Sequence, residues 1–387
     1  MAEFAETVET IKTEEASVAN LFGGDGARLR GRRHNPKYMG QLAEAAAFIA
    51  DVYEGRRPLY HMQEAMATDD FPTLFADVLD RQLLANYAEY PTDYLSYVRQ
   101  STVPDFRSVK RYAVDGAEAV LPEVAELEEY PEGALSESAD SLSVRKYGRR
   151  LDLSWEAMVN DDLDAFRRNP ERLARAARRS EAKFITGLFV DSSGPHSSLY
   201  DSSNTVSSNP VLSVTSLAAG MQMLSTLTDE DDEPIFFEAL ELVVPPALEV
   251  TANNIVNALQ IEMTDTGGSS SQKLIAQNWL KNRLSVRVNP YIPIVATTNG
   301  STSWFLFGSQ TGDGTRPALE FAKLRGHEEP ALYERVSNAR RVGGSGDAME
   351  SFDDDSVAWR VRHVFGGARL VNTGGKKSTV ASDGSGS

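Results

Sequence analysis

The stretch YAVDGAEAVLPEVAELEEYPEGALSESADSLSVRKYGRR, residues 112–150, contains an abrupt change in charge. Nine acidic residues and no basic residue lie between Tyr112 and Val144. Four basic residues then follow within six positions: Arg145, Lys146, Arg149 and Arg150. Because an ordinary solvated surface mixes both signs, this segregation predicts two complementary surfaces that meet on different copies of the chain.

Two strand candidates flank the acidic residues, at 107–114 and 144–153. The stretch between them, about 30 residues long, includes Pro122, Pro131 and Gly133 and shows no clear period. A compact domain seldom contains so long an irregular loop unless the loop is functional. We therefore expect 144–153 to be the return partner of 107–114, in an extended hairpin that projects from its own core.

A long helix is predicted over 161–190, with a break near Pro170, which could begin its second half. Leu173, Ala177, Phe184 and Leu188 form an apolar stripe at helical spacing. The opposite side is basic, with Arg167, Arg168, Arg172, Arg175, Arg178, Arg179 and Lys183. These side chains can face a neighbouring copy, or they can pair within the helix, as Glu171 and Arg175 would at i,i+4.

Elsewhere the sequence predicts a mixture of helices and strands, which indicates an α+β fold. Helices are expected at 39–53, 74–89, 214–227 and 246–260. Strands are expected at 240–244, 284–288, 292–297, 304–307 and 357–365, the last with alternating apolar residues. Residues 267–272 are expected to form a flexible connection, and the Ser-, Gly- and Asp-containing tail from Gly374 is expected to be disordered.

Composition limits the function classes. The 387 residues are 41% hydrophobic and 25% charged, as in a folded protein with more than one core. A net charge of −17 argues against tight binding to a nucleic-acid backbone. There is no cysteine, so disulfides, thiolate metal sites and a Cys nucleophile are excluded. No run of 18 apolar residues occurs, and the acidic N-terminal stretch is unlike a signal peptide.

The search for a catalytic or metal-binding constellation finds none. The five histidines, His34, His61, His196, His327 and His363, include no pair at the i,i+4 spacing of a helical metal site. The acidic runs 229–233 and 353–355 lack the ligand spacing of a calcium-binding loop. The Gly-rich segment 342–347 has Asp347 where a nucleophile elbow needs Gly. We therefore predict that the protein is not an enzyme and has no cofactor or metal.

Several segments, in this order, resemble the major capsid proteins of tailed bacteriophages, whose fold is shared with encapsulins and the floor of herpesvirus capsids. They are FPTLFADVLDRQLL, TVPDFRSVKRY, RKYGRRLDLSWEAMVNDD, LELVVPPALEVTANNI and WRVRHVFGGARLV, which lie between residues 71 and 372. The resemblance implies an α+β fold with six parts. These are an N-terminal arm with helices (1–105), an E-loop hairpin (106–153), the spine helix of a peripheral domain (154–205), an axial domain (206–316), peripheral-domain strands that return to the axial domain (317–373) and a disordered tail (374–387).

The same resemblance implies a structural protein that self-assembles into hexamers and pentamers of an icosahedral shell enclosing double-stranded DNA. Its partners would be further copies of the chain and scaffold, portal and decoration proteins, with packaged DNA contacted only weakly and non-specifically. It would be made in the host cytoplasm and end in the virion. An encapsulin-type nanocompartment protein is the alternative, and a soluble α/β enzyme a distant third.

A subunit interface is then expected between the acidic hairpin of one copy and the arginines of its neighbour. The acidic residues expected in it are Glu118, Glu123, Glu126, Glu128, Glu129, Glu132 and Glu137. The basic residues expected in it are Arg145, Arg149, Arg150, Arg172, Arg175 and Arg178.

Overall fold

The computed structural model describes residues 44–45, 47–48, 51, 56–57, 83–88, 92–115, 124, 136–154, 163–228, 235, 237, 240–265, 272–308, 317–335, 353–354 and 356–386. The chain divides into two compact units. The first contains residues 1–90, 146–178 and 329–363, and the second contains 91–145, 179–328 and 364–387. Most of the N-terminal arm predicted at 1–105 lies outside the described residues, including most of the helices expected at 39–53 and 74–89. Among the described residues, no helix is both long and apolar enough to cross a membrane.

The first unit combines helical and strand segments. Residues 83–88 are helical, and α6 (Leu163–Phe189) enters this unit with its N-terminal part. In this unit β13 (Ala331–Glu334) pairs antiparallel with β14 (Ser356–Arg369), Ala331 opposite Arg362. Its core cluster contains Leu83, Tyr87, Leu173, Ala174, Ala177 and Val361. The predicted apolar stripe of the long helix is therefore confirmed for this part of α6.

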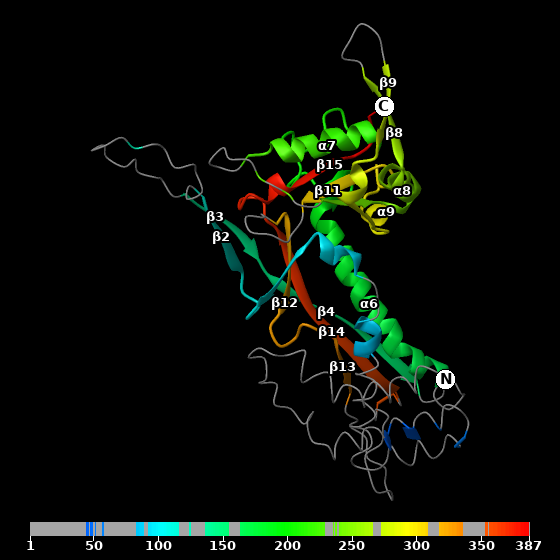
Figure 1. Cartoon of the computed structure of the whole chain (residues 1–387). Helices are drawn as coiled ribbons and strands as arrows, with labels where there is room; N and C mark the ends of the chain where they lie inside the picture. Colours follow the sequence, from blue (N-terminus) through cyan, green and yellow to red (C-terminus); the bar gives the residue numbers. More distant parts are fainter. Residues whose placement is uncertain are drawn as a thin grey trace, which may run out of the picture. The chain divides into compact units, whose positions relative to one another are not determined.

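The second unit contains two larger sheets (Figure 1). In one, β1 (Arg99–Val103) pairs parallel with β12 (Leu319–Leu324), and β12 pairs antiparallel with the last part of β14. The other has the order β10-β7-β11-β15, formed by Leu284–Val288, Leu240–Val244, Trp304–Gly308 and Thr379–Ser382. Helices α7 (Val214–Thr226) and α8 (Glu249–Asn257) pack on this sheet around a core that includes Trp304 and Leu306.

The hairpin prediction is correct in outline and wrong in its pairing. β2 (Val109–Asp115) pairs with β3 (Ser136–Leu142), not with the later segment, and Figure 1 shows the two as a separate ribbon. The expected return strand exists as β4 (Val144–Ser154), but it pairs with β14. Ser136–Leu142 was missed because its sequence, SESADSL, has few apolar residues, and only the cross-strand partner makes it a strand.

Three further predictions are wrong. Ile292–Val295 is the short helix α9, because Pro293 lies in its first turn and cannot donate to a strand ladder. The helix expected to reach residue 260 ends at Asn257, and β8 (Gln260–Asp265) and β9 (Gln272–Gln277) form an unpredicted ribbon. The connection expected at 267–272 lies outside the described residues, except for Gln272 in β9. Helix α6 runs through Pro170 without interruption.

The C-terminal tail is ordered, which corrects the expectation of disorder. Every residue of β15 is buried, and β15 pairs antiparallel with β11 from Trp304 opposite Ser382 to Phe307 opposite Thr379. On its other side, Val206 donates its N–H to Ala381 O at 2.9 Å, and Ala381 donates to Asn204 O at 3.1 Å. Polar composition suggested a solvated tail, but the short Thr-Val-Ala-Ser segment completes the sheet.

Candidate assembly interface

The base of the β2–β3 hairpin is fixed in the second unit by apolar packing. Leu142, at the end of β3, is fully buried, and Val109, opposite it in β2, packs against the same cluster. The cluster also contains Val103, Ala322, Val364 and further residues of β12 and β14. The two strands therefore begin at a base that is packed in the core of the second unit.

An ion pair adds a second attachment. Arg111, in β2, donates from Nε to Glu320 Oε1 at 2.8 Å, and its Nη2 lies 2.6 Å from the same oxygen. Nη2 also donates to Ser101 Oγ at 3.2 Å. The Glu320 side chain, in β12, is 1% exposed. Since a buried carboxylate that loses its partner typically destabilises a protein by about 3–5 kcal/mol, this pair holds β2 firmly against β12.

A third attachment lies on β3. Asp140 is buried, and its Oδ2 accepts from the backbone N–H of Asn372 and of Thr373, both at 3.0 Å. The hydroxyl of Thr373 donates to the same oxygen at 2.9 Å. In return, Asn372 Nδ2 donates to Ala139 O at 3.3 Å. The turn that follows β14 is therefore hydrogen-bonded to the second strand of the hairpin.

The crossing from β3 to β4 depends on a glycine. A Cβ added to Gly366, in β14, would lie 2.1 Å from Ser143 O and 2.7 Å from Val144 Cα. No side chain fits there, so the main chain passes directly over β14 between β3 and β4. Gly366 therefore allows the hairpin to be followed at once by the basic strand β4.

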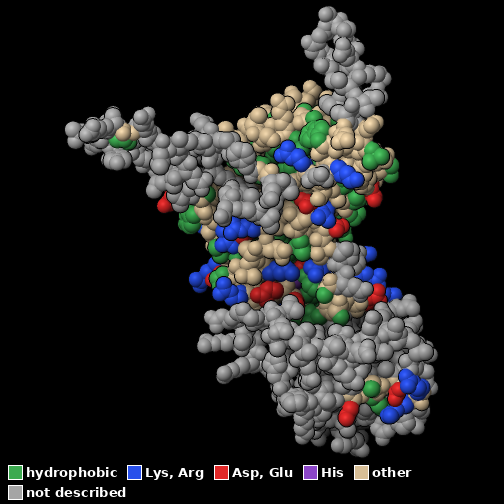
Figure 2. All heavy atoms as spheres, in the orientation of Figure 1, with side chains coloured by type: hydrophobic (Ala, Val, Ile, Leu, Met, Phe, Trp, Pro, Cys, Tyr) green, Lys and Arg blue, Asp and Glu red, His purple; other side chains and the backbone are tan. Residues whose placement is uncertain are grey.

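The basic residues predicted on β4 are exposed. Arg145, Arg149 and Arg150 all have exposed side chains, and Figure 2 shows Lys and Arg side chains in blue groups on the drawn face. Arg150 donates from Nε to Asp152 Oδ1 at 2.6 Å, with both side chains about half exposed. Arg145 and Arg149 form no ion pair or hydrogen bond with another described side chain. This strand therefore presents cationic groups that its own described surroundings do not neutralise.

The basic residues predicted on α6 differ from one another. Arg175 forms the expected intrahelical pair, with Nη2 2.5 Å from Glu171 Oε1. Arg178 donates from Nε to Tyr87 O at 2.8 Å, and its guanidinium lies 3.5 Å from the centre of the Tyr87 ring. Arg172 is exposed and has no ion pair among the described residues. Arg175 and Arg178 thus make contacts within their own subunit, whereas Arg172 remains available.

Most of the acidic partners cannot be placed. The residues Glu118, Glu123, Glu126, Glu128, Glu129 and Glu132 all lie outside the described residues, where only Val124 is described between 116 and 135. Glu137 lies in β3, opposite Val114, and is exposed. The contact between acidic and basic residues of two copies therefore stays a prediction.

The attachments of the hairpin were not among the predicted site residues. The strand segment LEFAKL (Leu319–Leu324) is mostly buried and contains Glu320 between apolar neighbours. A single carboxylate in such a segment is a signal for a buried ion pair, because Glu is almost never fully buried unpaired. Nothing in the sequence, however, indicates that Arg111 is its partner.

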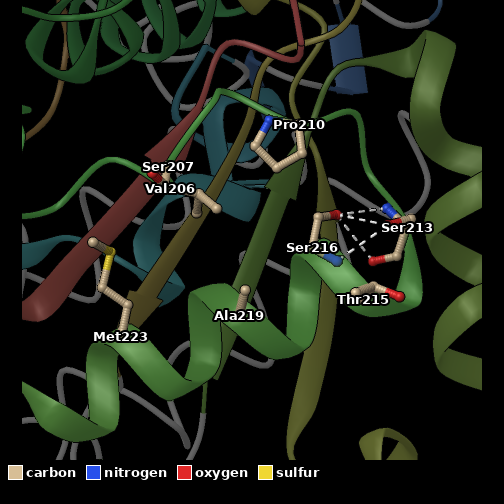
Figure 3. Close-up of a pocket in the computed structure, with 8 residues that line it drawn as sticks. All are labelled: Val206, Ser207, Pro210, Ser213, Thr215, Ser216, Ala219 and Met223. Atoms are coloured by element: carbon tan, nitrogen blue, oxygen red, sulfur yellow. Dashed lines mark hydrogen bonds between the residues drawn. The ribbon is translucent and has the colours of Figure 1, made fainter. Parts of the chain in front are cut away.

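A pocket of about 390 Å³ lies beside α7 in the second unit, shown in Figure 3. It is lined by Val206, Ser207, Pro210, Ser213, Thr215, Ser216, Ala219 and Met223, none of which is charged. The Ser213 and Ser216 side chains form a capping box at the start of α7, where Ser213 Oγ accepts from Ser216 N at 3.1 Å. Their hydroxyls therefore stabilise the helix end, and the lining offers no acid, base or metal ligand.

Comparison with solved structures finds weakly similar capsid and particle proteins. The chain resembles a protein of Microbacterium phage Oxtober96 at 12% identity and a TM-score of 0.45, covering 74% of this chain and 88% of that one. Mycobacterium phage Patience gives 12% identity, a TM-score of 0.44, and coverage of 82% and 90%. A virus-like particle from Pyrococcus furiosus gives 11% identity and a TM-score of 0.42, covering 79% of this chain and 98% of that one. No curated protein matches the sequence significantly.

The sequence itself matches one family model. The model is described as a phage capsid protein and matches residues 138–375, which run from β3, through α6 and most strands of the two larger sheets, to the start of the C-terminal segment. The match covers more than half of the chain, including the base of β3 and the whole of the basic strand β4. The chain therefore belongs to the phage capsid protein family, and it is a structural component of the virion shell rather than an enzyme.

Proposed function

We propose that this capsid protein forms the hexamers and pentamers of an icosahedral shell that encloses the double-stranded DNA of a tailed phage. In this shell the acidic hairpin segment of one copy contacts the basic strand β4 of a neighbour. The observation that carries the contact is the exposed run of arginines on β4, two of which have no ionic partner among the described residues. Such a contact is heterologous, and it closes into rings when the rotation between copies allows it.

The fixed base of the hairpin supports this proposal. Arg111 and Asp140 attach the two strands to the second unit through buried or half-buried polar groups. A loop that must find one partner surface loses less conformational entropy on binding if its base is already ordered. The attachments therefore favour a hairpin that presents its acidic residues in a limited range of positions.

The expected basic residues are not equivalent within the proposed contact. Arg175 and Arg178 already have partners in their own subunit, so a neighbour would have to compete with Glu171 or Tyr87. Arg145, Arg149 and Arg172 require no such exchange, and Arg150 would have to leave only the exposed Asp152. The three arginines of β4 are therefore the main basic side of the contact, with Arg172 as an addition.

The ionic contact sets register more than it sets total affinity. An exposed ion pair contributes about 0–1 kcal/mol, whereas complementary surfaces speed encounter and disfavour wrong arrangements. Burial of apolar surface must therefore supply most of the free energy of assembly. Salt screens the exposed charges over about 8–10 Å at ordinary ionic strength, so assembly should slow as salt is raised.

The test is a double charge reversal with a matched control. Arg149→Glu with Arg150→Glu should give folded subunits that fail to form particles, as seen by electron microscopy and sedimentation. Arg149→Lys with Arg150→Lys keeps both charges and should still assemble. Normal particles from the charge-reversed variant would show that β4 does not form the contact. A wild-type chain that stays monomeric at 42.4 kDa, even with the other head proteins of its phage, would refute the shell proposal as a whole.

The contents of the particle test the remaining part of the proposal. A subunit of net charge −17 cannot hold DNA tightly through its own surface, so packaged DNA would be contacted weakly and retained by the closed shell. Scaffold, portal and decoration proteins would be the further partners, and synthesis would take place in the host cytoplasm. Particles isolated from infected cells should therefore contain double-stranded DNA. Particles that contain an enzyme cargo and no DNA would favour the encapsulin-type alternative.

A further inference from the structure

The C-terminal end of α6 is capped by an arginine from a distant strand. The last turn of α6 contains no basic residue, and the final carbonyls of a helix have no partner within it. Arg369, in β14, donates from Nε to Leu188 O at 2.5 Å and from Nη2 to Gly187 O at 3.2 Å. A cation at a helix C-terminus also interacts favourably with the helix dipole. Arg369 therefore stabilises the end of α6 through both hydrogen bonds and charge.

The chain that leaves α6 turns back on itself at this helix end. β5 (Val190–Asp191) and β6 (Gly194–Pro195) form a short antiparallel ribbon. His196 follows β6, and its N–H donates to Phe189 O, at the last residue of α6, at a distance of 2.9 Å. The carbonyl of His196 accepts from the N–H of Tyr200, also at 2.9 Å. His196 therefore joins the helix end to the loop that follows the ribbon.

The His196 ring acts as a hydrogen-bond acceptor and is held in its neutral form. Nδ1 accepts from the N–H of Ser198 at 3.1 Å, so this nitrogen carries no proton while the bond is made. The ring is half-buried. Burial lowers the pKa of His196 from its ordinary value of 6.5, and the charge of Arg369 lowers the pKa further, whereas Asp191 acts in the opposite direction. The folded loop therefore favours the neutral imidazole.

Asp191 lies in the same loop, and its carboxylate already accepts two hydrogen bonds. Oδ1 accepts from Ser193 N at 2.7 Å, and Oδ2 accepts from Ser197 N at 3.3 Å. Burial lowers the pKa of Arg369, and the charge of Asp191 counteracts that effect. Asp191, His196 and Arg369 therefore form one electrostatic cluster, which has no net charge while the imidazole is neutral.

The neighbouring segments add little charge to this cluster. Residues 297–303, which contact the β5–β6 ribbon, contain no charged residue. Asp383 lies close to Gly194, and its carboxylate accepts a backbone hydrogen bond within its own segment. Farther along the loop, Asp201 is paired with Lys376 at 2.9 Å. The charge balance at the imidazole is therefore set by the capping arginine and by the carboxylate of β5.

We propose that His196, Arg369 and Asp191 form a pH-sensitive switch, in which a proton on His196 opens the loop after α6 and weakens the cap of the helix. Protonation at Nδ1 converts an acceptor into a donor, so the bond from Ser198 N is lost. It also places a second positive charge beside Arg369, and the cluster changes from no net charge to one positive charge. The switch belongs to the folded subunit and does not depend on assembly of a shell.

The direction of the pH effect follows from linkage between protonation and folding. Because the closed loop disfavours the proton, its stability is complete above about pH 6.5, the ordinary pKa of histidine, and declines as the pH falls below that value. Opening should therefore be about fivefold or more frequent at about pH 5 than at about pH 7.5. Asp201 does not contribute in this range, since its pKa of about 2 lies far below it.

Amide hydrogen exchange of full-length subunits tests the switch. Protection of the Ser198 and Tyr200 amides, corrected for intrinsic exchange rates, should fall by about fivefold or more from about pH 7.5 to about pH 5. In His196→Asn an amide oxygen takes the place of Nδ1 as the acceptor and does not titrate, so protection should stay within about twofold. The same pH dependence in wild type and His196→Asn, or none in the wild type, would overturn the inference.

A second measurement separates a switch from a purely structural cap. The imidazole resonance of His196, identified by its absence from His196→Asn, gives the midpoint of protonation directly by NMR. Arg369→Gln removes the facing cation and should move this midpoint to higher pH. Arg325→Gln removes an exposed arginine beyond the end of β12 that is remote from Arg369 and should leave the midpoint unchanged. A wild-type midpoint at or above about 6.5, or one that Arg369→Gln does not move, would overturn the inference.

Discussion

The attachment of the hairpin through Asp140 predicts a local change in stability that can be measured residue by residue. The substitution Asp140→Ala removes the oxygen that accepts from Asn372 N, Thr373 N and Thr373 Oγ1. Hydrogen bonds to a charged group contribute about 1.5–3 kcal/mol each when they are well protected. Asn372 is exposed and Thr373 is half-buried, so water replaces part of what is lost.

We therefore expect the three bonds together to contribute about 2 kcal/mol to closing the turn after β14. Amide hydrogen exchange at Asn372 and Thr373 reports this opening free energy directly. A loss of about 2 kcal/mol should accelerate exchange at both amides by about 30-fold, since each 1.4 kcal/mol is tenfold. The amide of Phe305, in the other sheet of the same unit, should keep its wild-type rate.

Two further variants test whether the effect comes from the acceptor oxygens of Asp140 and not from any substitution on this strand. Ser141→Ala changes the exposed neighbour on the same strand and should leave both turn amides unaffected. Asp140→Asn retains one acceptor oxygen and should give an intermediate acceleration. If Asp140→Ala leaves exchange at Asn372 and Thr373 within about threefold of wild type in a folded protein, the attachment does not hold the turn and the reasoning from hydrogen bonding is wrong.

Two further predictions concern packing and pH. Gly366→Ala should destabilise the subunit by about 2 kcal/mol or more, because the added Cβ would meet Ser143 O at 2.1 Å. The control Gly187→Ala, with nothing within 4 Å in helix α6, should leave the thermal midpoint unchanged or raise it. Hydrogen bonds from Ser203 and Lys376 lower the pKa of Asp201 from 3.8 to about 2. Its contribution is thus complete above pH 3.8 and lost as the pH falls toward 2. In thermal melts the advantage of wild type over Asp201→Asn should shrink across that range, and a constant difference would refute it.

Prediction from the sequence succeeded where a long periodic segment decides the structure. The apolar stripe of α6 is visible because Leu173, Ala177 and Leu188 recur at helical spacing and are buried. The strand Leu240–Val244 and the helix from Val214 are found for the same reason, since each has its own clear pattern. The continuity of α6 through Pro170 was not predicted, because local propensity gives a boundary there and the rest of the helix outweighs it.

Prediction failed where distant residues decide the structure. β3 is polar and becomes a strand only opposite β2. The C-terminal Thr379–Ser382 becomes a strand because β11 and the segment around Thr205 leave room for one between them. Ile292–Val295 was predicted as a strand because its residues are apolar, although Pro293 favours a helix start. In each case the structure is decided by a contact with residues far away in the sequence, or by a single residue that overrides the local pattern.

The candidate site, too, could be predicted from the sequence only in part. The exposed arginines of β4 follow directly from the sequence, because four basic residues with few apolar neighbours have little chance of burial. Which arginines are already occupied does not follow, because the partner of Arg178 is a backbone carbonyl of residue 87 and lies in another helical segment. Charge patterning alone therefore identifies the surface and cannot rank its members.

The residues that fix the position of the hairpin differ from the residues proposed to recognise another copy. Arg111, Asp140 and Gly366 fix where the hairpin begins, and none of them needs to contact another copy. In the proposed contact, the acidic residues beyond the base would supply charge without having to determine geometry. If this division holds, substitutions at the base should alter the stability of the subunit, whereas charge reversal on β4 should alter assembly with little effect on unfolding. A charge reversal on β4 that unfolded the subunit as strongly as Gly366→Ala would show that position and recognition are not separated in this protein.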